Sequence, residues 1–177
     1  AASDVYKRQS FIMSARTKVE LEPNYSYVTA RILLDELRSE ALSFLGVAEQ
    51  STQQEMFDYY PKALQAFIEK GIELEMLNPE LKTFDLNKLG KAINPDNDFK
   101  FTYLGLQTLY DRYFIHSNDI RYELPQIFFM RVAMGLAIEE DDRENRAIEF
   151  YNLLSSFDYM SSTPTLFNSG TMRPQLS

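Results

Sequence analysis

The 177-residue chain contains no cysteine and no tryptophan, and histidine occurs once, as His116. Without cysteine, these residues form no disulfide, no thiolate metal site and no thiol nucleophile. A carboxylate-bridged metal site in a helical bundle needs two Glu-x-x-His pairs, and the residue three positions before His116 is Tyr113. We therefore expect no bound metal, and we interpret His116 as a solvated side chain. No Gly-x-Gly-x-x-Gly or Walker-type loop occurs either, which excludes the usual nucleotide-binding fingerprints.

Positive charge and long apolar runs are also scarce. Lysine and arginine total 18 against 26 acidic residues, a formal net charge of −8, and the basic residues form no stripe. This balance excludes general nucleic-acid affinity, although hydroxyls and loop amides suffice to bind a single phosphorylated metabolite. Apolar runs stay short of the roughly 18 residues that span a bilayer, and no secretory signal opens the chain. We expect a cytoplasmic protein with no membrane or nucleic-acid partner.

What the sequence does have is a helical, aromatic-rich pattern: 45% of its residues are hydrophobic, with 13 Phe and 11 Tyr among them. Along 24–46 the apolar side chains recur at spacings of three and four, which predicts a helix. Its expected buried face carries Tyr27, Ala30, Leu34, Leu37, Ala41 and Leu45. Gly46 is the expected stop.

A second helix is predicted after Thr52-Gln-Gln-Glu55, a capping box in which the hydroxyl and the carboxylate satisfy each other's exposed amides. Pro61 should kink or restart this helix, and Gly71 should end it. Two Asn-Pro dipeptides then favour turns, on either side of a short helix expected at 85–93.

A helical block and a hairpin are predicted next. One face of the helix carries Tyr103, Leu106, Tyr110 and Tyr113. We interpret this face as core, with a subunit contact as the alternative. A small β-hairpin should follow, with its turn at Asn118-Asp119.

One buried helix and one last helix complete the regular structure. Pro125 suits a first helical turn, since its missing N–H has no partner there. The helix 125–138 is apolar all round except at Arg131, so we expect it to be central and buried. We interpret the acidic run 139–142 as a solvated linker and not as a metal cluster. The inner face of the last helix, which should run out near Tyr159, carries Ala147, Tyr151 and Leu154.

Seven hydroxyl residues crowd the closing segment 161–177, where the helical period stops. Pro164 fixes the backbone beside Thr163, and Asn168-Ser169-Gly170 is a turn signal, so we predict a bent loop. Hydroxyls and free amides on such a loop can hydrogen-bond phosphate or ribose oxygens, although most such loops only connect elements. In the isolated chain we expect this segment to be mobile or loosely docked.

Four strings, taken in order, resemble the large (α) subunit of class I ribonucleotide reductase. They are EPNYSYVTARILLDELRSEAL (22–42), FTYLGLQTLYDRYFIH (101–116), ELPQIFFMRVAMGLAI (123–138) and STPTLFNSGTMRPQLS (162–177). The resemblance implies a mainly α domain at 24–160 with a small β-hairpin, preceded at 11–27 by the tail of an ATP cone. Residues 161–177 would begin a ten-stranded α/β catalytic barrel. Residues 1–10 stand apart, because SDVYKRQ resembles a translated sequencing adapter, and we interpret them as a non-native tail.

The resemblance also implies a function, for a piece of a longer protein. Members of the family reduce ribonucleoside diphosphates to deoxyribonucleotides for DNA synthesis by radical chemistry. They respond to ATP and deoxynucleotide effectors, take electrons from thioredoxin or glutaredoxin, form a homodimer of large subunits and receive the radical from a small (β) subunit.

Thr163 matches a hydroxyl that contacts substrate in this family, with Thr165 and Ser177 as adjacent candidates. The cysteines of the family mechanism would lie beyond position 177, so we expect the piece itself to be inactive and to bind no cofactor. The alternative is a non-catalytic, all-helical protein-interaction module.

Overall fold

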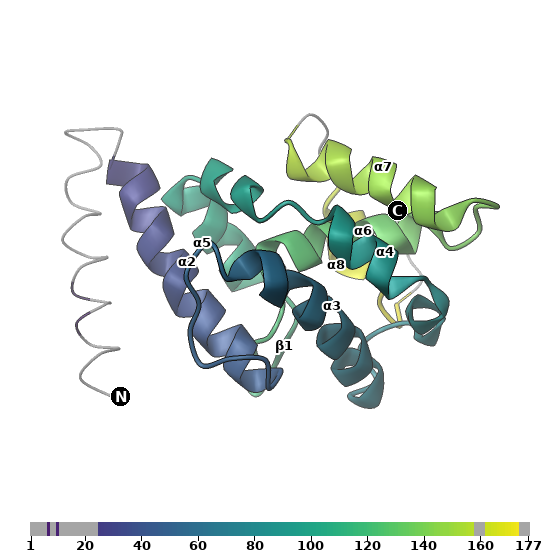
Figure 1. Cartoon of the computed structure of the whole chain (residues 1–177), viewed down its shortest axis with the longest axis horizontal. Coiled ribbons are helices and arrows are strands. Elements are labelled where there is room, and N and C mark those ends of the chain that lie inside the picture. Colours follow the sequence, from purple (N-terminus) through teal and green to yellow (C-terminus); the bar gives the residue numbers. More distant parts are fainter. Residues whose placement is uncertain (1–6, 8–9, 11–24, 158–161, 174–177) are drawn as a thin grey trace.

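The computed structural model describes residues 25–157 and 162–173, together with Lys7 and Ser10. It is mainly helical with one small antiparallel β-hairpin, which confirms the predicted fold class. In Figure 1, helix α2 (Tyr25–Phe44) lies at one end of the described part of the chain and α7 (Arg143–Ser155) at the other, with α6 (Pro125–Ala137) between them. The predicted non-native tail (1–10) and cone tail (11–27) fall almost wholly outside the described residues.

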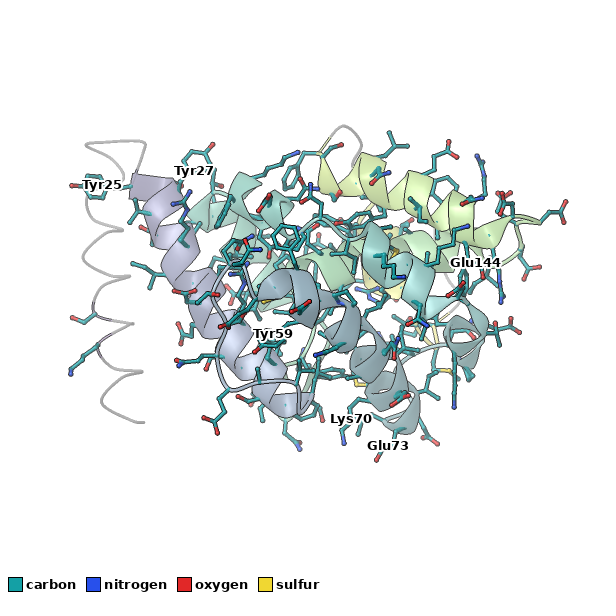
Figure 2. All side chains as sticks on the ribbon, in the orientation of Figure 1. Tyr25, Tyr27, Tyr59, Lys70, Glu73 and Glu144 are labelled. Carbon is teal, nitrogen blue, oxygen red and sulfur yellow. The ribbon has the colours of Figure 1, made fainter. Side chains whose placement is uncertain are left out.

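Helix α2 begins and ends close to the predicted limits. Gly46 has a φ of +72°, and the Val47 amide donates to the carbonyl of Leu42 at 2.9 Å, a Schellman-type stop that favours glycine. The predicted inner face is buried at Ala30, Leu34, Leu37 and Ala41 and half-buried at Leu45. Tyr27, however, is 46% exposed and lies at the upper end of α2 (Figure 2). Tyr27 lies in the first turn of the helix, where fewer of the described elements cover it.

Helix α3 (Met56–Glu73) starts behind the predicted capping box. Thr52 and Glu55 exchange hydrogen bonds, amide to side chain, at 3.2 and 3.3 Å. The expected restart at Pro61 is wrong, because α3 continues through it as one helix; the alternative, a kink, stays a prediction. The expected stop at Gly71 is wrong as well: the helix runs two residues further, and Lys70 and Glu73 lie at its surface end (Figure 2).

Gly71 is required for packing and not for a stop. A Cβ on this residue would lie 2.3 Å from Cδ1 of the buried Leu77, so a larger side chain would push the following segment away. The left-handed residue after the helix is Glu75, with a φ of 58°. A glycine inside an amphipathic pattern therefore marked a close approach between two segments.

The Asn-Pro dipeptides open short helices and not simple turns. The 3₁₀ helices η1 (Pro79–Thr83) and η2 (Pro95–Lys100) each begin with proline, and the side chains of Asn78 and Asn94 cap them. Proline at the first helical position loses no hydrogen bond, and an asparagine cap satisfies an exposed amide. Helix α4 (Leu86–Ala92) lies between them, as predicted.

Helix α5 (Tyr103–Arg112) leads into the hairpin of β1 (His116–Ser117) and β2 (Ile120–Arg121). Asn118 and Asp119 both have positive φ, 50° and 63°, as a type I′ hairpin turn requires. The prediction of this turn is confirmed, and so is the exposure of His116. On the aromatic face of α5, Leu106 is fully buried while the three tyrosines are half-buried.

Helix α6 is the centre of the core, since its residues from Pro125 to Met134 are all buried. It packs most extensively against α7, whose inner residues include Tyr151 and Leu154. Both predictions are confirmed, although α7 ends at Ser155 and the expected end near Tyr159 lies outside the described residues.

The closing segment is a correction to the loop prediction, because residues Thr163–Asn168 form the short helix α8. Ser162 takes an extended N-cap conformation and Pro164 occupies the first turn, where its fixed φ suits a helix. Gly170, with a φ of +76°, then bends the chain back. The turn signal at Asn168-Ser169-Gly170 was correct, but Pro164 lies in the first turn of a helix and not in a loop.

Candidate functional site

The predicted contact residues Thr163 and Thr165 both lie in the first turn of α8, with different exposure. The side chain of Thr163 is exposed, whereas Thr165 is 9% exposed and lies 3.0 Å, hydroxyl to hydroxyl, from Ser162. Only the Thr163 hydroxyl is therefore well placed to meet a ligand. Ser177, the third candidate, lies outside the described residues.

Tyr113 borders Thr163, a neighbour that sequence reasoning had assigned to the core face of α5. Its hydroxyl lies 3.4 Å from the Thr163 hydroxyl, and its ring stacks on Phe167 of α8 with centroids 4.6 Å apart. Fifty residues separate Tyr113 from Thr163 along the chain. Local periodicity carries no signal for such a contact.

A buried ion pair lies beneath α8. Glu123, just before α6, and Arg131, on its second turn, are both fully buried. The guanidinium donates to both carboxylate oxygens, from Nε at 2.7 Å and from Nη2 at 3.0 Å. This two-point geometry is the strongest form of an arginine–carboxylate contact. We call the pair and the carbonyls it binds the α8 clamp.

The remaining N–H groups of Arg131 reach the end of α8. Nη1 donates to the carbonyl of Ser169 at 2.8 Å, and Nη1 and Nη2 both approach the carbonyl of Leu166 at 3.3 Å. The last carbonyls of a helix have no partner within the helix and carry a partial negative charge. A buried cation at this position therefore both satisfies the carbonyls and complements their charge.

Close backbone packing completes the attachment of α8 to α6. A Cβ on Gly135 would lie 2.2 Å from the Gly170 nitrogen, and the Ser169 hydroxyl donates to the carbonyl of Val132 at 2.7 Å. On its other side the segment is tied to 76–78, where the Asn78 amide donates to the carbonyl of Gly170 at 3.0 Å. The expectation of loose docking is thus wrong for residues 162–173.

A second buried pair, which we call the core pair, joins Arg38 of α2 to Asp98 of η2 at 2.9 Å. Asp98 also accepts from the Tyr60 hydroxyl at 2.7 Å and from the Gln126 amide at 2.8 Å, while Arg38 donates to Gln53 at 2.6 Å. Burial raises the pKa of Asp98, although Arg38 and the other donors act to lower it. The core pair joins the main helices to one another and does not contact α8.

Tyr151 extends the core pair's network to α7. Its hydroxyl donates to the side chain of Gln126 at 2.8 Å and accepts from the Asn94 amide at 3.0 Å. Burial raises the pKa of Tyr151 to about 12. This hydroxyl therefore stays protonated at neutral pH and serves as a fixed structural donor.

The described residues provide neither a cluster of metal ligands nor a membrane-spanning helix. Among the described residues, no group of three or more histidine, aspartate or glutamate side chains is placed to hold a metal ion. Within the same part of the chain, no helix has the length and apolar character needed to cross a bilayer.

Residues 99–174, from η2 through the clamp to α8, match the family model described as "Ribonucleotide reductase, all-alpha domain". Over 94% of this chain, the ribonucleoside-diphosphate reductase subunit alpha of Chlamydia muridarum is 48% identical. The chain belongs to the ribonucleotide reductase large-subunit family.

More distant ribonucleotide reductase relatives match over a similar span. The subunit alpha of Helicobacter pylori is 38% identical over 96% of the chain, and the large subunit of Danio rerio is 34% identical over 93%. The chain spans only 15% to 20% of the length of these relatives. The ion pair of the α8 clamp, together with Tyr113 and Thr163, falls inside the matched all-alpha domain.

Proposed function

We propose that this chain is part of the catalytic large subunit of a ribonucleoside-diphosphate reductase, which reduces ribonucleoside diphosphates to deoxyribonucleoside diphosphates for DNA synthesis by radical chemistry. The observation that carries the proposal is the 48% identity, over 94% of the chain, to a protein of that name. A free-standing interaction module would not account for this likeness. Because the sequence contains no cysteine, thiyl chemistry must come from parts of the parent protein outside these residues.

Within that function, we propose that Thr163 contacts the substrate diphosphate. Its hydroxyl is exposed beside the hydroxyl of Tyr113, and hydrogen bonds to phosphate oxygens are strengthened by their charge. Thr165 is proposed as a supporting residue, since its hydroxyl lies against Ser162 and little of its side chain is exposed. Ser177 stays a prediction from the resemblance alone.

The partners and effectors of the parent protein are part of the same proposal. We propose a radical-generating small (β) subunit, a homodimer of large subunits, a thioredoxin or glutaredoxin reductant, ATP and deoxynucleotide effectors, and a cytoplasmic location. Likeness to reductase large subunits over 94% of the chain supports these assignments as a group.

The test is the change Thr163→Ala in the full-length large subunit that carries this sequence, assayed with its small subunit and reductant. We expect KM for ribonucleoside diphosphates to rise by the equivalent of about 1.5–3 kcal/mol, the contribution of one hydrogen bond to a charged group. Thr163→Ser keeps the hydroxyl and should stay close to wild type.

The two levels of the proposal fail in different ways. An unchanged KM in the Thr163→Ala enzyme removes Thr163 from the substrate site but leaves the reductase assignment intact. A correctly assembled full-length protein that reduces no ribonucleoside diphosphate contradicts the assignment itself.

A further inference from the structure

We infer that Arg131, held by Glu123, is a positioning residue: it fixes α8 so that the Thr163 hydroxyl meets the substrate. This inference rests on the proposed function and adds a residue to it. Arg131 is fully buried, so it cannot touch a ligand and must act through the backbone it binds. What it binds is the end of the helix that carries Thr163.

Hydrogen bonds fix both the position and the orientation of the Arg131 guanidinium group. Its Nε and Nη2 bind the two oxygens of Glu123, and its Nη1 binds the carbonyl of Ser169. A planar fork of fixed N–H directions defines an orientation as well as a distance, which the single ammonium of lysine does not. The carbonyls of Leu166 and Ser169 are therefore held at fixed positions relative to α6.

Glu123 ties the same point to the hairpin. Besides Arg131, its Oε1 accepts from the amide of Ile115 at 3.2 Å, and the carbonyl of Ile115 accepts from the Tyr122 amide at 3.2 Å. One carboxylate thus joins the base of the hairpin, α6 and, through Arg131, α8. The anchor of α8 is itself anchored from two sides.

Helix α8 transmits this position to Thr163 over a single turn. The helix has six residues, too few to be stable without tertiary contacts, so its place is set by what binds it. The Leu166 amide donates to the carbonyl of Ser162 at 3.1 Å, which makes the clamped carbonyl and Thr163 parts of one rigid turn. A shift at the clamp therefore becomes a shift of the Thr163 hydroxyl.

The chemistry of the clamp also favours positioning over simple stability. A buried ion pair gives little net stability compared with apolar residues of the same volume. The carbonyls of Leu166 and Ser169, however, need a donor wherever α8 is docked. An arginine donates to these carbonyls and also defines their position, whereas an apolar residue would do neither.

The test uses the full-length large subunit, assayed with its small subunit, and compares Arg131→Lys with Arg38→Lys. Both changes weaken a buried pair, but only the first touches α8. We expect both variants to have a lower melting temperature than the wild-type enzyme. Only Arg131→Lys should also raise KM for ribonucleoside diphosphates, by about tenfold, the scale of one displaced hydrogen bond.

A second background separates positioning from general damage. If Arg131 acts through Thr163, then Arg131→Lys should change KM by less than about twofold in an enzyme that already carries Thr163→Ala. A full additional rise in that background overturns the inference, as does an unchanged KM for Arg131→Lys alone. An unchanged KM for Thr163→Ala alone would instead contradict the proposed substrate contact.

A milder pair of variants covers the case in which Arg131→Lys does not fold. Ser169 and Ser155 are equally buried, each 1% exposed, but Ser169 bonds α8 to α6, whereas Ser155 bonds Asn97. Ser169→Ala should raise KM by about threefold, and Ser155→Ala should leave it unchanged. Equal KM values for the two variants contradict the role of the α8 attachment.

Discussion

The core pair and the α8 clamp are two buried arginine–carboxylate pairs with different surroundings. Around Arg38 and Asp98 the partners are side chains, from Gln53, Tyr60 and Gln126. Around Glu123 and Arg131 they are backbone groups: two carbonyls at the end of α8 and one amide before the hairpin. The first joins helices through replaceable side chains, and the second fixes the course of the main chain.

This difference decides what evolution or mutagenesis can change. A network of side chains can be exchanged as a set for neutral residues that satisfy one another. Backbone groups are present whatever the sequence, so a buried carbonyl always needs a donor. The clamp should therefore tolerate less substitution than the core pair, although both arginines are almost completely buried.

The largest expected effect does not separate the two pairs. Arg38→Met and Arg131→Met each leave a buried carboxylate without its cation, which should lower the free energy of unfolding of the 177-residue chain by about 3–5 kcal/mol. Urea unfolding followed by circular dichroism measures both. A loss under about 1 kcal/mol at either site would mean that this pair is solvated in solution.

Neutralising both partners should separate the pairs. The double change Arg38→Gln with Asp98→Asn replaces the core pair by amides that can bond one another, and we expect a loss of only about 1–2 kcal/mol. Arg131→Gln with Glu123→Gln leaves the α8 carbonyls without their donors, and the loss should stay near 3 kcal/mol. Equal losses would contradict the distinction between side-chain and backbone partners.

Crowding the contact between α8 and α6 should give an intermediate effect. Gly135→Ala places a methyl group against the Gly170 nitrogen and should cost about 1–3 kcal/mol. In Gly105→Ala the new methyl group meets its nearest neighbour, the Thr102 hydroxyl, at 3.3 Å. That control in α5 should be within about 0.5 kcal/mol of wild type. If the two variants unfold at the same urea concentration, α8 does not pack on α6 as described.

The smallest expected effect concerns the hydroxyl of Tyr151, the uncharged group that joins the core pair's network to α7. Burial raises the pKa of Tyr151 from 10 to about 12, so this hydroxyl keeps its proton to a higher pH in the folded protein than in the unfolded chain. The stability that its hydroxyl provides is complete below pH 10 and is lost as the pH rises towards 12. The stability difference between wild type and Tyr151→Phe, about 1 kcal/mol at neutral pH, should therefore shrink over this window. A constant difference in urea unfolding would contradict the raised pKa.

The sequence correctly predicted those elements whose formation depends on interactions between nearby residues. The apolar stretch after Pro125, the capping box at Thr52 and the positive-φ turn at Asn118-Asp119 each depend on neighbours within a few residues. Gly71 was misread because a packing contact decides its role: Leu77, just beyond the end of α3, lies where a side chain at position 71 would be.

The candidate site was only partly predictable. Thr163 was identified by resemblance, but its exposure and its neighbour Tyr113 depend on a contact across 50 residues. The clamp did leave one signal. Arg131 is a single charge on an otherwise apolar helix, and a buried charge needs a partner. That partner is Glu123, which lies two residues before the start of the helix.

The central claim is that α8, held by the clamp, presents the Thr163 hydroxyl to the substrate diphosphate. The most direct measurement is the equilibrium dissociation constant of a ribonucleoside diphosphate for the full-length large subunit, with and without Thr163→Ala. A loss of one hydrogen bond to a charged group predicts binding weaker by about tenfold or more. Equal dissociation constants for the two proteins would contradict the claim.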